Sequence, residues 1–215
     1  MPDTIRLTDD DFALLHRLEE ADEVEDDLAA ALDDLWGRVE SALQRATGQL
    51  DDEWRVDLWP WNLEGDRFPF VWARCKLDEA DEFAAHLGAF LSPGHCNLCL
   101  DLEKDALDDG SAAETLDQVR GFWRGPVAPL LRAAEDPRLK VWTDPDNVVA
   151  PEIYVEEGLG ELLSRNNDPE HPWPRVGYLP SRQSLVGVED LVALLVDRFR
   201  TLAPLYRGQI AYCRG

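Results

Sequence analysis

Residues 54–59 read Trp-Arg-Val-Asp-Leu-Trp, residues 70–77 read Phe-Val-Trp-Ala-Arg-Cys-Lys-Leu, and residues 97–103 read Asn-Leu-Cys-Leu-Asp-Leu-Glu. Apolar and polar residues alternate in all three stretches, which is the pattern of a β-strand with one buried face. The acidic helical stretches on either side need an apolar surface to pack on, and these strands provide one. We therefore expect a sheet here, around which the rest of the chain is organised.

Helical spacing of apolar residues predicts two helices before this sheet and a long one near the end of the chain. Thr8, followed by three aspartates, is typical of a helix start. A second helix is expected over residues 23–46 and the last over 185–202. The fold class is therefore α+β: a mainly antiparallel sheet with helices packed against it, two N-terminal helices and one amphipathic C-terminal helix. We expect a single domain over 1–215, with a helical segment over 1–50 and a sheet-containing body over 51–215.

Weaker local patterns predict the elements that fill the middle of the chain. Residues 78–88 are expected to form a helix, and Ser111 with Glu114 is expected to be a capping box that opens another. Short strands are expected over 139–142, 152–155 and 175–179. Residues 164–174 are polar and rich in proline, which predicts a plain surface loop, with a lid or recognition loop as the alternative.

The chain is strongly acidic, with a formal net charge of -23 and a pI of about 4.3. Lys76, Lys104 and Lys140 are its only lysines, so most of its positive charge is arginine. Repulsion among like charges destabilises a compact state at low salt, and salt screens that repulsion. We interpret the composition as that of a protein from a salt-adapted, halophilic organism. The alternative is an ordinary acidic soluble protein.

Composition also excludes several classes of partner and compartment. Binding to a phosphate backbone needs clustered Lys and Arg, and the sequence has no such run, so we expect no nucleic-acid partner. No apolar stretch approaches the roughly 18 residues of a membrane span, and the first residues lack a signal-peptide pattern. We expect a cytoplasmic protein that does not contact membranes. Its four cysteines are then expected to be reduced thiols.

One short motif has a recognisable chemical shape, namely His95-Cys96 followed by Cys99. A pair of cysteines at this spacing can ligate zinc or cycle between thiol and disulfide. However, a structural zinc site usually needs four ligands, and the sequence contains no second such pair. The odd separation also sends the two thiols to opposite faces of a strand. We therefore predict packing cysteines, no cofactor, and zinc on His95, Cys96 and Cys99 as the alternative.

A second candidate site is the polar face of the predicted sheet. By strand parity, six residues can share this face: Arg55, Asp57, Trp72, Arg74, Asp101 and Glu103. Carboxylates beside guanidinium groups and an indole ring can bind a polar ligand or a divalent cation. The alternative is a solvated face held by ion pairs across the strands. His16, in the first predicted helix, has no evident partner.

No nucleophile or phosphate-binding motif is recognisable, so we expect a non-catalytic protein that binds another protein or a small polar ligand. Eight tryptophans favour this hypothesis because Trp is enriched at binding hot spots. The first alternative is a thiol- or metal-dependent enzyme centred on His95, Cys96 and Cys99. The second follows from the layout of aromatic strands and a late amphipathic helix, which is similar to the DNA-reading modules of modification-dependent restriction systems. That resemblance implies DNA binding, which the net charge opposes.

The charge predicts how stability depends on salt. Because molar KCl screens the repulsion among the acidic side chains, we expect the melting temperature to rise between low and molar KCl. Differential scanning calorimetry across that range tests this. A melting temperature that stays flat or falls would contradict the interpretation of a salt-adapted protein.

Overall fold

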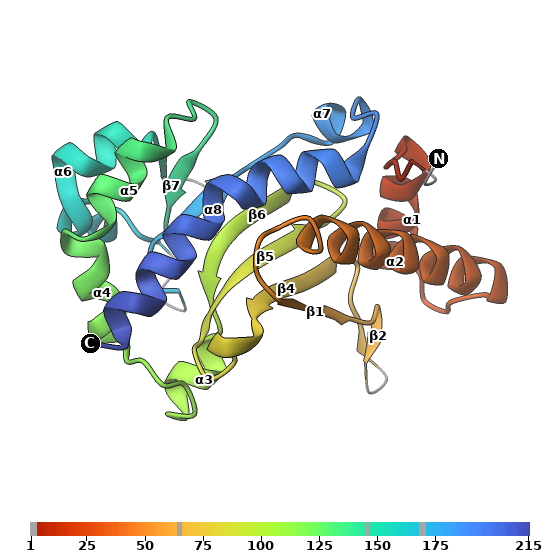
Figure 1. Ribbon diagram of the computed structural model, residues 1–215. Coiled ribbons are helices and arrows are strands. Elements are labelled where there is room, and N and C mark those ends of the chain that lie inside the picture. Colours follow the sequence, from red (N-terminus) through yellow and green to blue (C-terminus); the bar gives the residue numbers. More distant parts are fainter. Residues whose placement is uncertain (1–3, 64–65, 145–146, 168–170) are drawn as a thin grey trace. The chain divides into compact units, whose positions relative to one another are not determined.

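The computed structural model describes residues 4–63, 66–144, 147–167 and 171–215. It confirms an α+β fold with a sheet of seven strands in the order β1-β4-β5-β6-β9-β7-β8 (Figure 1). The chain divides into two compact units, each built from several segments. Unit 1 comprises residues 1–75, 88–98 and 179–198, and unit 2 comprises residues 76–87, 99–178 and 199–215. The prediction of one domain over 1–215 stays a prediction.

Unit 1 begins with the two predicted helices, α1 (Asp9–Glu20) and α2 (Asp26–Thr47). Thr8 caps α1 as expected, with its hydroxyl accepting from the backbone N–H of Asp11. The unit also contains β1 (Trp54–Trp59), a small hairpin of β2 (Asn62–Leu63) and β3 (Asp66–Arg67), and α7 (Arg182–Val186). Trp61 folds back on α2, where its indole N–H donates to Asp33 at 2.8 Å.

Three strands and the last helix run through both units. They are β4 (Val71–Leu77), β5 (Ala85–Leu91), β6 (Cys96–Leu102) and α8 (Leu191–Cys213). In unit 1, their apolar faces surround a void of about 40 Å³ together with α2. Val71, Leu98 and Leu195 are among its lining residues, so alternation on the strands does place one face in the core.

Unit 2 contains α3 (Lys104–Asp108), α4 (Leu116–Arg124), α5 (Val127–Ala134), β7 (Lys140–Trp142), β8 (Val148–Val149), α6 (Pro151–Ser164) and β9 (Arg175–Tyr178). Strand β7 pairs antiparallel with β9 on one side and with β8 on the other. Gly158, at φ 82°, interrupts α6 with a kink that glycine adopts without steric cost. The sequence Asp144-Pro-Asp-Asn147 has the composition of a turn, and residues 145 and 146 lie outside the described part of the chain.

The helix expected over residues 78–88 is wrong. A single 3₁₀ turn (Asp78–Ala80) is followed by β5, which lies between β4 and β6 in the sheet. Residues 84–91 form a nearly continuous apolar run, and such a run fits a buried strand as well as a buried helix. Phe83 and Leu87 are buried, as the helix prediction also required.

The capping box expected at Ser111 and Glu114 is also wrong. Helix α4 starts later, and its capping box pairs Thr115 with Gln118. Glu114 is buried instead, and its two carboxylate oxygens accept the backbone N–H groups of Ala84 and Ala85 at 3.1 Å each. Glu114 therefore fixes the start of β5, which no local pattern indicates.

Two further boundaries differ from the sequence prediction. Residues 152–155 are not a strand but the first turns of α6, where Pro151 occupies a position in the first turn that needs no backbone donor. The final helix begins at Leu191 rather than 185, after the separate short helix α7, and continues past Pro204 to Cys213.

Substituting Glu114 tests whether its two hydrogen bonds hold the start of β5 in place. Glu114→Gln leaves one side-chain oxygen, so one of the two backbone N–H groups loses its acceptor inside the protein. We expect the free energy of unfolding to fall by about 1–3 kcal/mol in urea denaturation. Glu82→Gln, at an exposed position of the same unit, is the matched control. If both substitutions lower the free energy of unfolding equally, Glu114 does not hold the start of β5 in the way described.

Candidate functional site

The residues predicted for the polar face of the sheet fall into two sets. In unit 1, the Asp57 carboxylate accepts from Arg55 Nε at 3.2 Å and from Arg74 Nε at 3.0 Å. The rings of Trp59 and Trp72 stack with centroids 4.0 Å apart, and the guanidinium carbon of Arg74 lies 4.8 Å from the Trp59 ring. The structure thus brings Arg55, Asp57 and Arg74 into contact, and Trp72 joins them through the ring of Trp59.

Asp101 belongs to unit 2, where it binds other parts of the same unit. It accepts from the indole N–H of Trp173 at 2.9 Å and from Arg175 Nε at 2.8 Å. Burial opposes ionisation, but the charge of Arg175 and the bonds from the Trp173 indole and the Leu102 backbone N–H hold the pKa of the Asp101 carboxyl below its usual range. Asp101 therefore anchors the expected loop at its Trp173 end.

Glu103 lies directly after β6, and its backbone N–H donates to the carbonyl of Ala84 at 3.0 Å. Ligand binding by the six predicted residues stays a prediction. His86 lies on β5, a place that the wrong helix over residues 78–88 hid. His86 is 1% exposed, and burial lowers the pKa of its imidazole despite the nearby Asp101 carboxylate.

The cysteines predicted for a zinc or redox site are buried. Cys96 and Cys99 both lie on β6, three residues apart, so their side chains leave the strand on opposite faces. Burial raises the pKa of the Cys96 thiol to about 12, which disfavours the reactive thiolate. Among the described residues, no three His, Cys, Asp or Glu side chains are placed to hold a metal ion. Zinc on His95, Cys96 and Cys99 stays a hypothesis from the sequence.

His95 instead lines an open groove in unit 1, which we call the α1 groove. Its volume is about 680 Å³. It is bordered by α1, by the segment before β4, by the turn between β5 and β6, and by Arg182 of α7. Its lining residues are Phe12, Ala13, His16, Glu19, Pro69, Phe70, Ser92, Pro93, Gly94, His95 and Arg182.

The helical wall of the groove is one stripe of α1. Phe12, His16 and Glu19 recur at the spacing of four and three that keeps residues on one face of a helix. Phe12 is 1% exposed and forms the floor, whereas His16 and Glu19 are largely exposed. The imidazole of His16 lies 3.4 Å from Glu19 and 3.5 Å from Glu20.

On the opposite wall the groove is lined by the rings of Phe70 and His95, which belong to a row of rings that also includes Phe68 and Phe90. Centroids are 5.6 Å apart for Phe68 and Phe70, 5.1 Å for Phe70 and Phe90, and 5.1 Å for Phe90 and His95, whose rings stack. The Ser92 hydroxyl accepts from the His95 backbone N–H at 3.2 Å and lies 3.1 Å from Nδ1 of its ring. The turn therefore fixes the His95 ring at the groove.

Arg182 provides the cation of the groove. Its guanidinium carbon lies 5.3 Å from the Phe12 ring, and its Nε and Nη2 donate to Asp9 Oδ1 at 2.9 and 2.6 Å. An arginine above an aromatic ring is held by the ring's negative face as well as by its ion pair. The contact also joins α7 to the start of α1.

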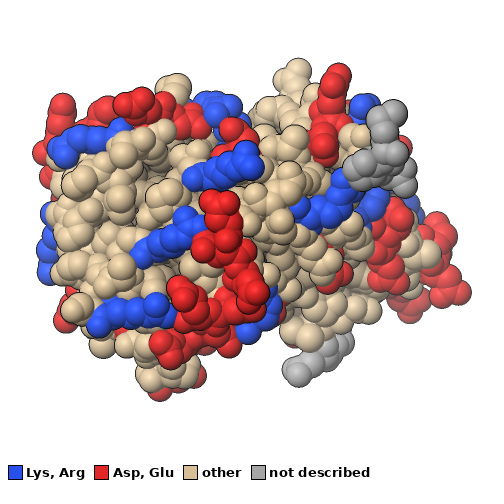
Figure 2. All heavy atoms as spheres, in the orientation of Figure 1, with Lys and Arg blue, Asp and Glu red and all other residues tan. Residues whose placement is uncertain are grey.

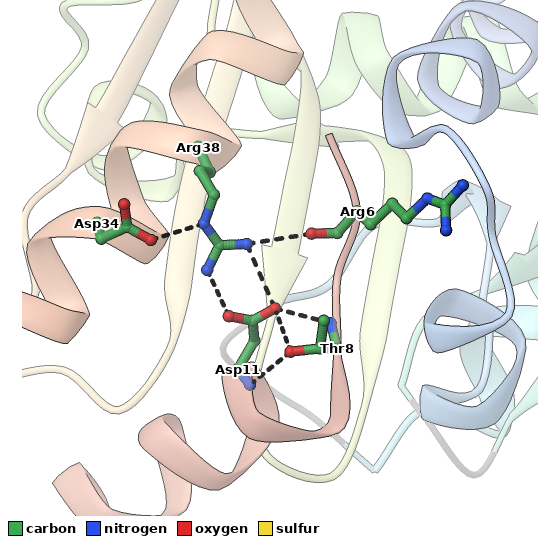
Figure 3. Close-up of polar contacts among 5 residues, drawn as sticks. All are labelled: Arg6, Thr8, Asp11, Asp34 and Arg38. Atoms are coloured by element: carbon green, nitrogen blue, oxygen red, sulfur yellow. Dashed lines mark hydrogen bonds and ion pairs between the residues drawn. The ribbon is translucent and has the colours of Figure 1, made fainter. Parts of the chain in front are cut away.

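A network around Asp11 holds α1 in its place (Figure 3). The Asp11 side chain is almost fully buried, and it accepts from the backbone N–H of Thr8 at 2.7 Å and from the guanidinium of Arg38. Arg38 also donates to Asp34 at 2.8 Å and to the carbonyl of Arg6 at 3.1 Å. The bonds to Asp11 and Asp34 raise the pKa of Arg38 against the effect of burial.

No family model matches the sequence, and no curated protein matches it.

The groove residues are not recognisable as a set in the sequence, because α1, the β5–β6 turn and α7 are distant from one another along the chain. His16 and His95 were noted singly, and they are two of the chain's four histidines.

The burial of His86 predicts how stability depends on pH. The unfolded chain takes up a proton at His86 near its ordinary value of about 6.5, while folded His86 stays neutral to lower pH. The free energy of unfolding should therefore fall as the pH drops from about 7 to 5, by at most about 1.4 kcal/mol per pH unit from this group.

Replacing the histidine should remove that contribution. We expect His86→Gln to show a flatter dependence on pH than the wild type in urea denaturation. A slope unchanged by His86→Gln would show that His86 is not the group that titrates.

Proposed function

We propose that this is a non-catalytic binding protein that holds a small polar ligand in the α1 groove. The observation that carries the proposal is the groove itself, where a hollow of about 680 Å³ combines aromatic rings with a guanidinium, a carboxylate and two imidazoles. Ligand sites are commonly concave, of roughly 300–1,000 Å³, with a few polar groups among apolar ones. The Arg55, Asp57 and Arg74 cluster fits this role less well because its charges are already paired with one another.

Several observations support binding over thiol chemistry. All four cysteines are buried, and burial raises the pKa of Cys75 and Cys96 to about 12. A nucleophilic cysteine needs an accessible thiolate with a lowered pKa. The groove has no cysteine that is accessible, so its histidines lack a thiol to activate.

Charge supports a small ligand or a protein as the partner rather than nucleic acid. The net charge of -23 repels a phosphate backbone at long range. Figure 2 shows basic side chains standing among acidic ones on the face drawn, without a broad basic patch.

A cytoplasmic location and a salt-adapted source belong to the same proposal and rest on the sequence. No helix among the described residues has the length and apolar content to cross a membrane.

A blocked groove tests the proposal. Ala13 is exposed and lines the groove, so Ala13→Trp fills the hollow without disturbing the core. Ala30→Trp, at an exposed position of α2 outside the groove, is the matched control. The probes are amino acids, short peptides, sugars, and aromatic acids and amines at millimolar concentration. Binding is detected by NMR of the His16 and His95 imidazoles.

We expect at least one probe to shift both imidazole resonances, and the shifts to disappear in Ala13→Trp but persist in Ala30→Trp. No shift with any probe, or shifts that survive Ala13→Trp, would refute a ligand site in the groove.

A further inference from the structure

We propose that the ligand of the α1 groove is a small zwitterion that carries a flat ring, such as an aromatic amino acid or a short aromatic peptide. This inference rests on the proposed function and specifies the chemistry that the groove recognises. It follows from three features of the lining: a cation at one end of the α1 stripe, a carboxylate at the other end, and a row of rings on the opposite wall.

The cationic end has donors left for a ligand carboxylate. Arg182 uses Nε and Nη2 for Asp9, and Nη1 has no acceptor among the described residues. The Arg182 side chain is 43% exposed and lies above the Phe12 ring. A guanidinium held in place by an ion pair and a ring binds a carboxylate with little further loss of side-chain freedom.

The acidic end has an acceptor left for a ligand ammonium group. Glu19 is the one carboxylate among the lining residues, and its side chain is 56% exposed. Only its Oε2 lies near His16, at 3.4 Å, which leaves Oε1 for a donor from the ligand. A ligand that brings an ammonium group to Glu19 and a carboxylate to Arg182 satisfies both ends.

The spacing of the two ends suits a small molecule. Phe12, beneath Arg182, and Glu19 are separated by two turns of α1, or about 10 Å along the helix axis. Both groups are on long, partly exposed side chains that can turn toward a ligand, so a free amino acid or a short peptide can reach both ends, each added residue lengthening a peptide by roughly 3.5 Å. Phe70 and His95 then offer a flat wall to the ring of the ligand.

The net charge of the protein favours a zwitterion over an anion. A chain of charge -23 repels an anion before it reaches Arg182, whereas a molecule of zero net charge meets no such long-range penalty. A simple cation would be attracted to the surface, yet it would bring no acceptor to Nη1 of Arg182.

The test compares ligands that lack one feature at a time. Phenylalanine and glycylphenylalanine carry ring, ammonium and carboxylate. The comparison probes are 3-phenylpropanoate without the ammonium, phenethylamine without the carboxylate, and alanine without the ring. Affinities are measured by NMR of the His16 and His95 imidazoles in 1 M KCl, where the Debye length of about 3 Å suppresses long-range effects of net charge.

We expect at least one of the two zwitterions with a ring to bind about tenfold or more tightly than each comparison probe, in line with the loss of one charged contact or, for alanine, of the ring. If phenylalanine binds more tightly than glycylphenylalanine, the groove prefers a free amino acid. The opposite order indicates a peptide. Arg182→Gln should bring the affinity for that zwitterion down to the affinity for phenethylamine, and Glu19→Gln down to the affinity for 3-phenylpropanoate. Arg17→Gln, on the same helix but outside the groove, should change neither.

A comparison probe that binds as tightly as both zwitterions would overturn this inference, and so would variants of Arg182 and Glu19 that leave the preference intact. If none of these five probes binds but another small molecule shifts the groove resonances, the zwitterion is wrong and the binding function stands. If no small molecule shifts them, the binding function itself fails.

Discussion

The ion pair between Asp11 and Arg38 is the interaction on which the rest of unit 1 depends. A carboxylate as buried as that of Asp11 is costly unless hydrogen bonds and an opposite charge compensate for the lost water. Asp11 receives both, from Thr8 at the start of its own helix and from Arg38 of α2. Because Arg38 also binds the carbonyl of Arg6, one guanidinium joins the N-terminal segment, α1 and α2.

That pair connects the core to the groove. Asp11 and Phe12 are neighbours, so fixing the carboxylate also fixes the ring beneath Arg182, and one or two turns further along α1 the same helix presents His16 and Glu19. The opposite wall is stabilised separately. The Ser92 hydroxyl in the β5–β6 turn accepts from the His95 backbone N–H, and the His95 ring stacks on Phe90. The groove is thus assembled from two separately stabilised walls.

The sequence predicted the elements whose signals are local. Alternation located β1, β4 and β6, and the Thr8 cap located α1, because both signals depend on neighbours within a few residues. It failed where a distant residue decides the structure. Ser111 and Glu114 have the spacing of a capping box, yet Glu114 is buried against the start of β5, and only the folded chain brings the two together.

The candidate site was predictable to a smaller degree for the same reason. Strand parity correctly grouped Arg55, Asp57 and Arg74, which lie on neighbouring strands. It could not foresee that Asp101 binds Trp173 and Arg175. In the sequence, His95 is notable only for its position next to Cys96. In the structure, its ring stacks on Phe90 and lines the α1 groove. Nothing in the sequence connects His16 with Arg182.

A double-mutant cycle on Asp11 and Arg38, measured by urea unfolding, tests the central claim most directly. Arg38→Gln should lower the free energy of unfolding by about 3–5 kcal/mol, because it leaves the buried Asp11 carboxylate without its opposite charge. Asp11→Asn should cost less, about 1–3 kcal/mol, because Arg38 is partly exposed and keeps its bond to Asp34. The double variant should lose clearly less than the sum, with a coupling energy of about 2 kcal/mol or more. Losses that add within about 0.5 kcal/mol would show that the two residues act independently, and would contradict the role assigned to the pair.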